Sequence, residues 1–527
     1  MGWKIAASIY FLVCVLFFSL RTVSWQQVND PAQFHYLCFL MAHGMSPYHD
    51  LIEMNMPGTY MMHWGVIHLL GAGSLAWRCF DYILMAVAAC AMIVIAKPHD
   101  WFAGVLASTL FILFHGRDGA GQLGQRDLVI AILLLCAYAF FFEAIRKHRD
   151  FLMLGFGVTA GYAATIKPTP LPFALLLLVL GAIYLKKHRE APSRYIAYAC
   201  AGLVLPFALT LSFLATKHSV DSFFLFLRVM LPYYAKVGRP GYGNLLQLLM
   251  TTSLWIFTLT ALLIVFKKEG AWTWEMKPRA LGVLVGFPRD EQDWSTWEVK
   301  MIALGVAFGA ASYWGQGKGM HYHRYPLLAF LFLWISAQIV GALRNTGFLQ
   351  VAGVGGLIYA MAIAPQYAYQ GIKKTWSPDY VNALTSDLNH LGGASLSGKV
   401  QCLSTQAECD TALYRMRLVQ ATGLFYDFLV FRTEHDRAIE LARQRFWQEL
   451  ASNPPDVLVV NTDLYPKTDG YVKLAQWPAF HSYLDSNFVL YNERDFGAGQ
   501  SGNMAYRIYV RKGSKQDAGA ADALNAN

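Results

Sequence analysis

The first two thirds of the chain alternate long apolar stretches with short polar loops. A membrane-spanning helix needs roughly 20 predominantly apolar residues, and about eleven stretches approach that length. They centre on residues 4–20, 76–96, 101–115, 128–145, 151–166, 171–185, 194–215, 245–266, 300–314, 326–343 and 346–364. The pattern therefore predicts a polytopic α-helical membrane protein with about eleven transmembrane helices.

A twelfth apolar stretch, residues 57–70, is shorter and contains His63 and His68. We interpret it as an interfacial helix that lies beside the membrane, within a polar loop over residues 21–72. If it does span the membrane, the orientation of every later segment changes.

The pattern changes after residue 365. Short apolar runs at 399–403 and 456–461 predict buried strands, and residues 435–450 have the spacing of an amphipathic helix. Residues 488–493 and 506–511 predict a hairpin joined by the glycine-rich loop 497–502. We therefore predict a membrane domain over residues 1–365, a soluble α/β domain over 366–512 and a disordered tail over 513–527.

Composition and charge agree with a membrane protein. The chain is 55% hydrophobic and 15% charged, whereas soluble domains carry about 25% charged residues. The net charge of +9 lies largely in short loops, where it sets topology, so we expect no nucleic acid partner. No small-residue cleavage site follows residues 4–20, so that segment is interpreted as a retained helix.

The positive-inside rule orients the loops. Basic loops at 146–149, 186–189, 267–268 and Arg344 alternate with the loop that contains Asp30 and are predicted to be cytoplasmic. The loops that then face outward together with Asp30 are 117–127, 167–170, 217–244 and 315–325. The loops richest in unusual residues thus share one face, which favours a single active site there.

The first outer loop contains Asn29-Asp30-Pro31, then the G-x-x-P-Y-x-D run over residues 44–50, then Pro57-Gly58. This pattern resembles the first outer loop of the GT-C membrane glycosyltransferases, of the type of bacterial protein mannosyltransferases and lipid A aminoarabinose transferases. The resemblance implies a polyprenyl-phosphate sugar donor and an acceptor outside the cytoplasm. It also implies a bacterial inner membrane location, with the active site and the C-terminal domain on the periplasmic side.

In that family an acidic residue early in this loop removes the acceptor's proton, so the resemblance makes Asp30 the candidate catalytic base. Many members have a second acid directly afterwards, where this chain has Pro31. Alternatively, Asp30 is an N-cap for a helix that starts at Pro31. Four further residues of the loop are expected to bind substrate, although an ordinary polar turn is an equal alternative: Tyr48, Asp50, Glu53 and Asn55.

The second outer loop, residues 117–127, contains a G-x-G-x-x-G run over 119–124. It follows a membrane helix rather than a strand, so it is not a dinucleotide-binding fingerprint. Glycines at a helix N-terminus expose backbone N–H groups to an anion, and Arg126 adds a fixed charge. We therefore predict that this loop and Arg126 bind the donor phosphate, with Arg117 and Asp127 contacting substrate. The alternative is a tight connection in which Arg126 pairs with Asp118 or Asp127.

Two more outer segments supply cations. Lys167 ends an outward-running apolar helix, a costly position unless the amine reaches headgroups or is used, and we expect it to bind the donor phosphate. The run over residues 316–326 is dense in cations and imidazoles. His323 and Arg324 are expected to contact the phosphate, and Lys318 and His321 the substrate. His-x-His alone is a weak metal signal, so a divalent metal is a minor alternative and no metal ligands are assigned.

The cysteines carry one further prediction. Six of the eight lie in or beside apolar segments, but Cys402 and Cys409 are close together in the soluble domain. If that domain lies outside the cytoplasm, a local disulfide between them is expected.

The sequence therefore predicts an inverting membrane glycosyltransferase of hexosyl or pentosyl type that uses a polyprenyl-phosphate sugar. The acceptor is a glycan, a glycolipid or a protein. Two alternatives share the basic outer loops: a transporter or flippase for a lipid-linked sugar, and a non-catalytic membrane assembly protein. Against the transporter, the chain has no internal repeat of the kind that many transporters contain.

Overall fold

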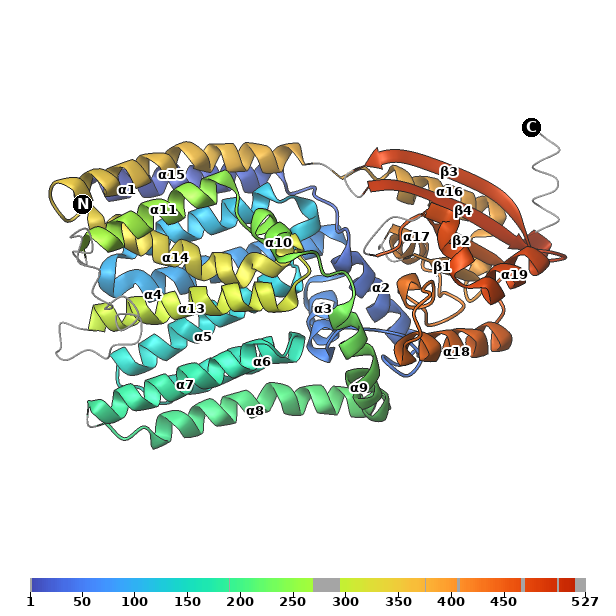
Figure 1. Cartoon of the computed structure of the whole chain (residues 1–527), viewed down its shortest axis with the longest axis horizontal. Helices are drawn as coiled ribbons and strands as arrows, with labels where there is room; N and C mark the ends of the chain where they lie inside the picture. The colour runs from blue at the N-terminus through green and yellow to red at the C-terminus, as the bar shows by residue number, and fades with distance from the viewer. Residues whose placement is uncertain are drawn as a thin grey trace. The chain divides into compact units, whose positions relative to one another are not determined.

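The structure is a computed structural model that describes residues 2–188, 190–268, 294–374, 376–404, 408–465, 470–499 and 502–516. The chain divides into two compact units (Figure 1). Unit 1 consists of Met1–Trp25, Gly73–Thr210 and Arg239–Thr375, and unit 2 of Gln26–Ala72, Leu211–Gly238 and Trp376–Asn527.

Unit 1 is a bundle of helices that lie side by side (Figure 1). They are α1 (Gly2–Arg21), α4 (Ser74–Arg117), α5 (Arg126–Arg146), α6 (Leu152–Ile166), α7 (Pro170–Lys187), most of α8 (Ser193–Thr216), α10 (Tyr242–Leu249), α11 (Thr252–Lys268), α13 (Trp294–Gln316), α14 (Tyr325–Ala342) and α15 (Phe348–Lys373). Each predicted apolar segment falls in one of these helices or, for 245–266, in the pair α10 and α11.

Within the described residues, seven helices are long and apolar enough to cross a membrane. The number rises to eight if α10 and α11, which meet at 86°, form one broken span. The predicted count of about eleven is higher partly because α4 is counted once in these totals although it contains two helices.

Helix α4 folds back on itself at Asp100, whose backbone is extended (φ −172°, ψ 120°) just after Pro98. A Cβ added to Gly104 would lie 2.5 Å from the Cα of Ile93. Those residues would stand about 16 Å apart along one continuous helix, so the two halves must run antiparallel. Proline cannot continue a regular helix, which explains why the predicted segments 76–96 and 101–115 are separate.

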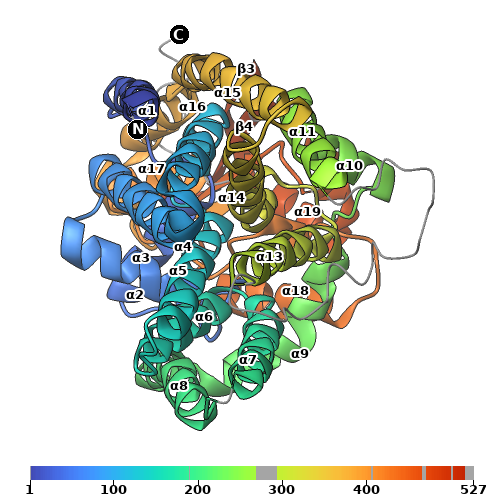
Figure 2. The ribbon, with the colours of Figure 1, turned by 90° about the vertical axis from the view of Figure 1, so that its left-hand side faces the viewer.

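The centre of unit 1 is formed by α5 and α14, whose apolar windows are 72% and 83% buried, against 22% for α1. Viewed along the helices (Figure 2), α14 lies between α4 and α13, and it packs against both. One end of the bundle has ion pairs from the predicted cytoplasmic loops: Arg344 bonds Asp100 at 2.8 Å, and Arg146 bonds Glu298 at 2.7 Å. Those predicted outer loops that belong to unit 1 lie at the other end: 117–127, 167–170 and 315–325.

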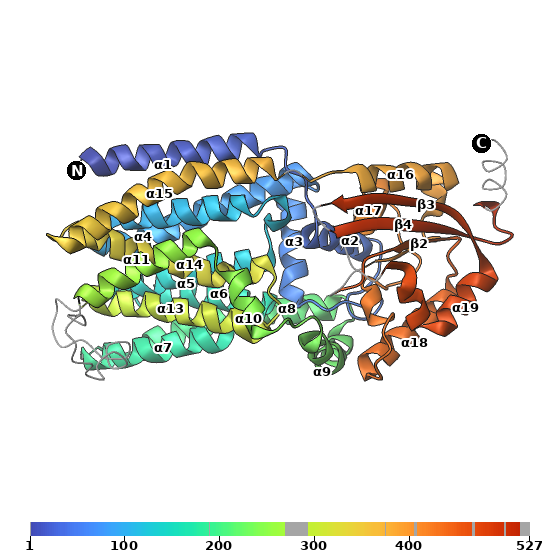
Figure 3. The same ribbon diagram turned by 45° about the horizontal axis from the view of Figure 1, so that its top comes forward.

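Unit 2 contains the predicted α/β domain. Its sheet has the order β1-β2-β4-β3, in which β1 pairs parallel with β2 and the other pairs are antiparallel. Strands β3 and β4 lie side by side in Figure 3. The elements of this part are α16 (Asp379–Leu391), β1 (Val400–Leu403), α17 (Glu408–Met416), α18 (Arg437–Ser452), β2 (Val457–Asn461), α19 (Pro478–Asn487), β3 (Phe488–Gly499) and β4 (Gly502–Arg511). All four predicted strands are present, and β3 and β4 pair antiparallel as the predicted hairpin requires. Residues 500 and 501 of the predicted loop 497–502 lie outside the described residues. The predicted tail lies mostly outside the described residues, which end at 516.

Unit 2 also includes the first outer loop, with α2 (Asp30–Ala42) and α3 (Pro57–Leu70), and α9 (Val220–Lys236). Helix α2 packs on α17. The Tyr36 hydroxyl donates to Leu418 O at 3.0 Å, and Ile52 N donates to Gly423 O at 2.8 Å. By its contacts the loop belongs with the C-terminal elements, a grouping that the domain prediction did not make.

The predicted disulfide between Cys402 on β1 and Cys409 on α17 is present, with Cα atoms 6.1 Å apart. It links strand β1 to helix α17, and α2 packs on α17. Its sequence separation is only seven residues, so it closes a short segment of the chain rather than a long one.

Candidate active site

The glycine-rich loop at the outer end of unit 1 is tightly folded. Gly124 has φ +56°, and a Cβ there would lie 2.5 Å from the Trp77 ring, so a residue with a side chain would not fit. Trp77 also donates its indole N–H to Leu123 O at 2.9 Å. These contacts hold the start of α5, and with it Arg126, in place.

Six N–H groups of this loop donate to protein acceptors. Gly124 N bonds the Asp81 carboxylate at 3.0 Å, and the other five bond backbone carbonyls of residues 115–122: Asp118, Gly119, Gln122, Leu123 and Gln125. Anion binding by the remaining backbone N–H groups of the loop and by Arg126 stays a prediction.

Lys167 and Asp127 are brought together. Lys167 directly follows α6, and its Nζ donates to both carboxylate oxygens of Asp127 at 2.9 Å and to Gln316 Oε1 at 2.5 Å. Asp127 is 1% exposed. Lys167 therefore joins three predicted outer loops, and its charge is partly balanced.

Asp118 forms a second ionic group with two predicted site residues. Its carboxylate accepts from Arg324 at 2.5 Å and from Arg117 at 3.1 Å. Burial alone would raise the pKa of Asp118, but the two guanidinium groups outweigh it and hold this pKa below its ordinary value. Both guanidinium groups also lie over the ring of Phe114. Arg126, which one alternative made the partner of Asp118, is not a member of either of these two pairs.

Lys318 stands among further cations. Burial lowers its pKa to about 6, and the positive charges of Lys167, Arg126 and Arg239 add to the effect. Arg239, from the outer loop at 217–244, lies beside Gly317 in this cluster. We name Arg126, Lys167, Arg239 and Lys318 the cation cluster. Asp127 pairs with Lys167 within this cluster. The cations of the cluster still repel one another, as the lowered pKa of Lys318 shows, and an anion would relieve that repulsion.

Two predicted imidazoles lie in the same loop, with different surroundings. His323 is 4% exposed, and its Nδ1 has no hydrogen-bond partner in the described part of the chain. A buried polar atom without a partner is costly, which marks His323 as available to a bound ligand. His321 is exposed and lies near Asp118 and Arg324. Within the described residues, no group of three or more His, Cys, Asp or Glu side chains could hold a metal ion.

Asp30 lies in unit 2 as the first residue of α2, and its side chain is half-buried. The cap position belongs to Asn29 (φ 58°), whose carbonyl accepts from the N–H groups of Ala32 and Gln33 at 3.0 and 3.3 Å. The N-cap of α2 is therefore Asn29, one residue before Asp30, which the alternative had proposed. An acid in the first turn still interacts favourably with the helix dipole.

A buried group that sequence reasoning missed supports the turn at Asp30. Gln27 donates to Pro31 O at 3.0 Å and bonds His35, and His35 Nδ1 lies 3.2 Å from His63 Nδ1. Burial lowers the pKa of His35 to about 4, so the imidazole is neutral at physiological pH. In the sequence, this group could have been recognised from the position of His35, one helical turn after Pro31.

The other predicted residues of this loop make internal bonds in unit 2. Tyr48 is 3% exposed and bonds Asn55 O, while Glu53 Oε1 accepts from Met54 N at 2.8 Å and from Tyr426 OH at 3.2 Å. Asp50 accepts from Ser46 N at 2.6 Å. These bonds give each residue a structural role, and substrate binding by them stays a prediction.

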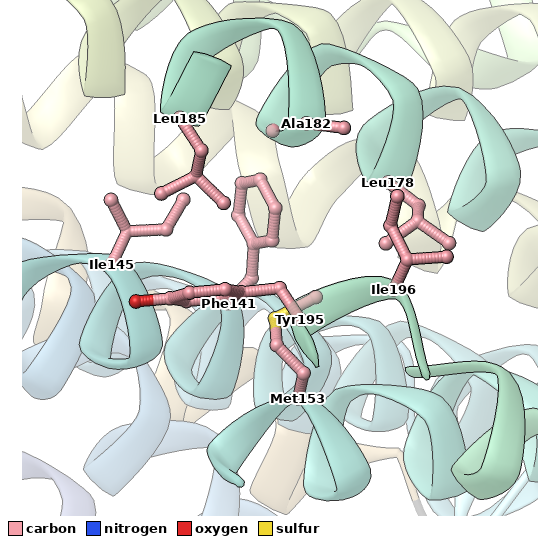
Figure 4. A pocket seen from close by; sticks show the side chains of 9 residues that line it. Phe141, Ile145, Met153, Leu178, Ala182, Leu185, Tyr195 and Ile196 are labelled. Carbon is pink, nitrogen blue, oxygen red and sulfur yellow. The ribbon is translucent and has the colours of Figure 1, made fainter. Parts of the chain in front are cut away.

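An apolar pocket lies among α5, α6, α7 and α8 (Figure 4). Its lining consists of Phe141, Ile145, Met153, Leu178, Gly181, Ala182, Leu185, Tyr195 and Ile196. It contains no charged side chain. Its α7 residues belong to the half of that helix far from Lys167, so it is separate from the cation cluster.

The chain matches no family model and no curated protein, but two solved structures share its fold. ArnT from Cupriavidus metallidurans, bound to undecaprenyl phosphate, is 11% identical with a TM-score of 0.51, and the match covers 96% of this chain and 98% of that one. The archaeal oligosaccharyltransferase AglB from Archaeoglobus fulgidus, in complex with an inhibitory peptide and a dolichol-phosphate, is 10% identical with a TM-score of 0.51, and the match covers 98% of this chain and 77% of that one.

At these identities the likeness concerns the fold. The chain has the GT-C fold that its first outer loop predicted: a polytopic α-helical membrane protein with a small α/β part at its C-terminal end. The roles of its residues are taken up as proposals below.

Proposed function

We propose that this protein is a membrane glycosyltransferase that moves a sugar from a polyprenyl-phosphate donor to an acceptor hydroxyl outside the cytoplasm. The observation that carries the proposal is the cation cluster at one end of a GT-C bundle. The leaving group of this reaction is a lipid phosphate, which gains negative charge in the transition state. Preformed positive charge stabilises that change.

In the proposed reaction Asp30 accepts the proton of the acceptor hydroxyl. The hydroxyl oxygen attacks the anomeric carbon, and the bond from that carbon to the phosphate oxygen breaks. The electron pair leaves with the lipid phosphate, toward Lys167, Lys318 and Arg324, and His323 contacts its oxygens. One displacement inverts the anomeric centre.

We further propose that residues 1–365 form the membrane domain of a bacterial inner membrane protein, with residues 366–512 on the periplasmic side. The disulfide between Cys402 and Cys409 supports an oxidising compartment. The acceptor is a glycan, a glycolipid or a protein. A hexosyl and a pentosyl donor are equally compatible with the described residues.

The test is transfer of label from radiolabelled polyprenyl-phosphate sugars to a crude membrane acceptor fraction. We expect Asp30→Asn to lower the transfer rate by about 10²–10⁴-fold, the usual contribution of a general base. Asp379→Asn is the matched control, because Asp379 is likewise the first residue of a helix in unit 2. This control should transfer at the wild-type rate.

Two results would revise the proposal. Transfer that persists in Asp30→Asn would keep the enzyme class and leave Asp30 as a helix-start residue. No transfer by the wild type from any donor, while a known transferase works in the same assay, would favour the flippase or assembly alternatives.

A further inference from the structure

A second polar network is buried in unit 1, and the proposed reaction does not use it. Asp81 is 0% exposed and accepts three hydrogen bonds: from Arg78 at 2.6 Å, from His115 Nε2 at 3.2 Å and from Gly124 N at 3.0 Å. His115 Nδ1 in turn lies 2.7 Å from the Tyr325 hydroxyl. These contacts join both halves of α4 to the starts of α5 and α14.

The Asp81 carboxylate fixes the direction of one of these hydrogen bonds. A carboxylate can only accept, so His115 must donate from Nε2–H to Asp81. Toward Tyr325, a neutral imidazole accepts from the hydroxyl at Nδ1, whereas an imidazolium donates to the hydroxyl from Nδ1–H. In either state the carboxylate, the imidazole and the hydroxyl form one connected chain.

Such a network is costly at this place in a membrane protein. Arg78, His115 and Tyr325 are each at most 1% exposed, like Asp81. Ionisable groups in membrane helices are rare and commonly mark function. Arg78 is held further by Thr22 at 2.6 Å and by the ring of Tyr82, 4.1 Å away. Arg78 Nε has no hydrogen-bond partner among the described residues, but the carboxylate, the imidazole and the Tyr325 hydroxyl are all paired. These paired groups favour one rigid arrangement.

The network ends at two positions next to the candidate phosphate-binding residues. Gly124 lies two residues before Arg126, and Tyr325 directly follows Arg324. The two loops that carry these cations are therefore fixed to the same buried carboxylate. Arg324 also bonds Asp118, which belongs to the first of the two loops.

We propose that the Asp81–His115–Tyr325 chain positions Arg324 and the glycine-rich loop for binding the lipid phosphate, with Tyr325 and His115 as positioning residues. This inference rests on the proposed function. A merely structural role would predict that losing the Tyr325 hydroxyl costs no more than losing any other buried hydroxyl of the bundle.

The chain offers a matched control for that comparison. Tyr138 is also 0% exposed in unit 1, and its hydroxyl donates one hydrogen bond, to Met301 O at 2.9 Å. Tyr325→Phe and Tyr138→Phe therefore remove the same group from the same bundle. Only the first removes a bond beside Arg324.

The experiment measures binding of undecaprenyl phosphate to the full chain in detergent, together with the melting temperature of each variant. We expect Tyr325→Phe to raise Kd by about tenfold and Tyr138→Phe to leave Kd within about twofold, with similar melting temperatures. His115→Gln keeps a donor toward Asp81 but removes Nδ1, the partner of the Tyr325 hydroxyl. It should weaken binding as much as Tyr325→Phe, and the double variant should be no worse than either single variant.

The outcomes separate the two proposals. Wild-type binding with equal Kd values in Tyr325→Phe and Tyr138→Phe would overturn the positioning role and leave the phosphate site intact. Additive losses in the double variant would also overturn it, because the two residues would then act independently. Absence of binding by the wild type would instead overturn the phosphate site itself, and the positioning role with it. If Tyr325→Phe does not fold, the test compares the Kd of His115→Gln with the Kd of Tyr138→Phe.

Discussion

Two groups of buried acids, one in each unit of this protein, have opposite surroundings. In unit 1, Asp127 bonds Lys167, and Asp118 bonds Arg324 and Arg117, so the pKa of Asp118 is lowered. In unit 2, burial raises the pKa of Glu408 to about 7, and the neighbouring charge of Asp463 adds to the rise. The first group is paired with cations, whereas the second gathers acids together.

The difference shows where an anion could bind. The cations of the cluster repel one another at Lys318, so a phosphate would relieve this repulsion in unit 1. In unit 2 the pKa of Asp410 is also raised well above its ordinary value, first by burial and then by Asp463 and Glu408. An anion there would meet like charge. The two units should therefore respond in opposite ways to substitution and to pH.

The largest effect is expected from Lys167→Met, because it leaves the buried Asp127 carboxylate without its closest cation. We expect a loss of about 3–4 kcal/mol in stability and loss of undecaprenyl phosphate binding, measured by thermal melting and by titration. The double variant Lys167→Met with Asp127→Asn should recover most of the stability but not the binding. If the double variant also recovers binding, Lys167 serves only to pair with Asp127 and does not bind the phosphate.

Glu408→Gln should have the next largest effect, with the opposite sign. The folded pKa of about 7 lies above the ordinary Glu value of 4.5. The stability that its proton provides is therefore full below the unfolded pKa and is lost as pH rises through the folded pKa. The amide should gain about 2–3 kcal/mol over wild type at pH 8 and nothing at pH 4.

Melting curves of the full chain at both pH values measure this gain. The control is Glu440→Gln, an exposed acid on α18 in the same unit. A gain for Glu408→Gln that does not depend on pH would contradict the assignment of Glu408 as the titrating group.

Lys318→Met should weaken undecaprenyl phosphate binding by about 10–30-fold at pH 6, about 1.4–2 kcal/mol, the range of a charge-assisted hydrogen bond. Because the pKa of Lys318 is about 6 in the empty site, a bound anion raises it and binding takes up a proton above that pH. Wild-type affinity should therefore fall relative to the variant as pH rises from 6 to 8.

The ratio of the two Kd values removes the titration of the phosphate itself, which is common to both proteins. Lys187→Met, at the end of α7, changes a cation far from the cluster and should leave the ratio near one. A ratio that stays constant with pH would show that Lys318 does not titrate on binding.

The smallest effect is expected from Asp50→Asn. The side chain is 38% exposed, and an amide oxygen can still accept from Ser46 N. We expect a stability change of about 0.5 kcal/mol and no change in phosphate binding. The transfer assay then separates the two interpretations of this loop, because a fall of tenfold or more would mark Asp50 as a substrate contact and an unchanged rate would mark an ordinary turn.

Sequence patterns predicted the elements of the fold better than the contacts between them. The break between segments 76–96 and 101–115 was visible at Pro98, and the four strands follow apolar runs bounded by turn residues. In contrast, the pairing of Asp81 with His115 joins residues 34 positions apart that meet only because α4 folds back. Nothing in the local pattern of either segment specifies that meeting.

The candidate site shows the same limit. Lys167 and the run at 316–326 were recognisable because cations at the ends of apolar helices are costly. Their partners were not, since Asp127 could pair with Arg126 or Lys167 equally well by sequence. The glycine-rich loop shows it too, because Gly124 N donates to Asp81, an acceptor on another helix that the local pattern does not specify.

The hairpin of α4 has a consequence for how the protein is made. Arg78 and Asp81 are in its first half, and each charge inserted alone would cost up to about 3 kcal/mol at a helix centre. His115 and Gly124, which complete their hydrogen bonds, are synthesised only after the chain has turned at Asp100. We therefore expect the translocon to release the two halves together. Substitutions that disrupt the helix over residues 101–117 would then prevent membrane integration of the nascent chain, before any of the C-terminal elements is synthesised.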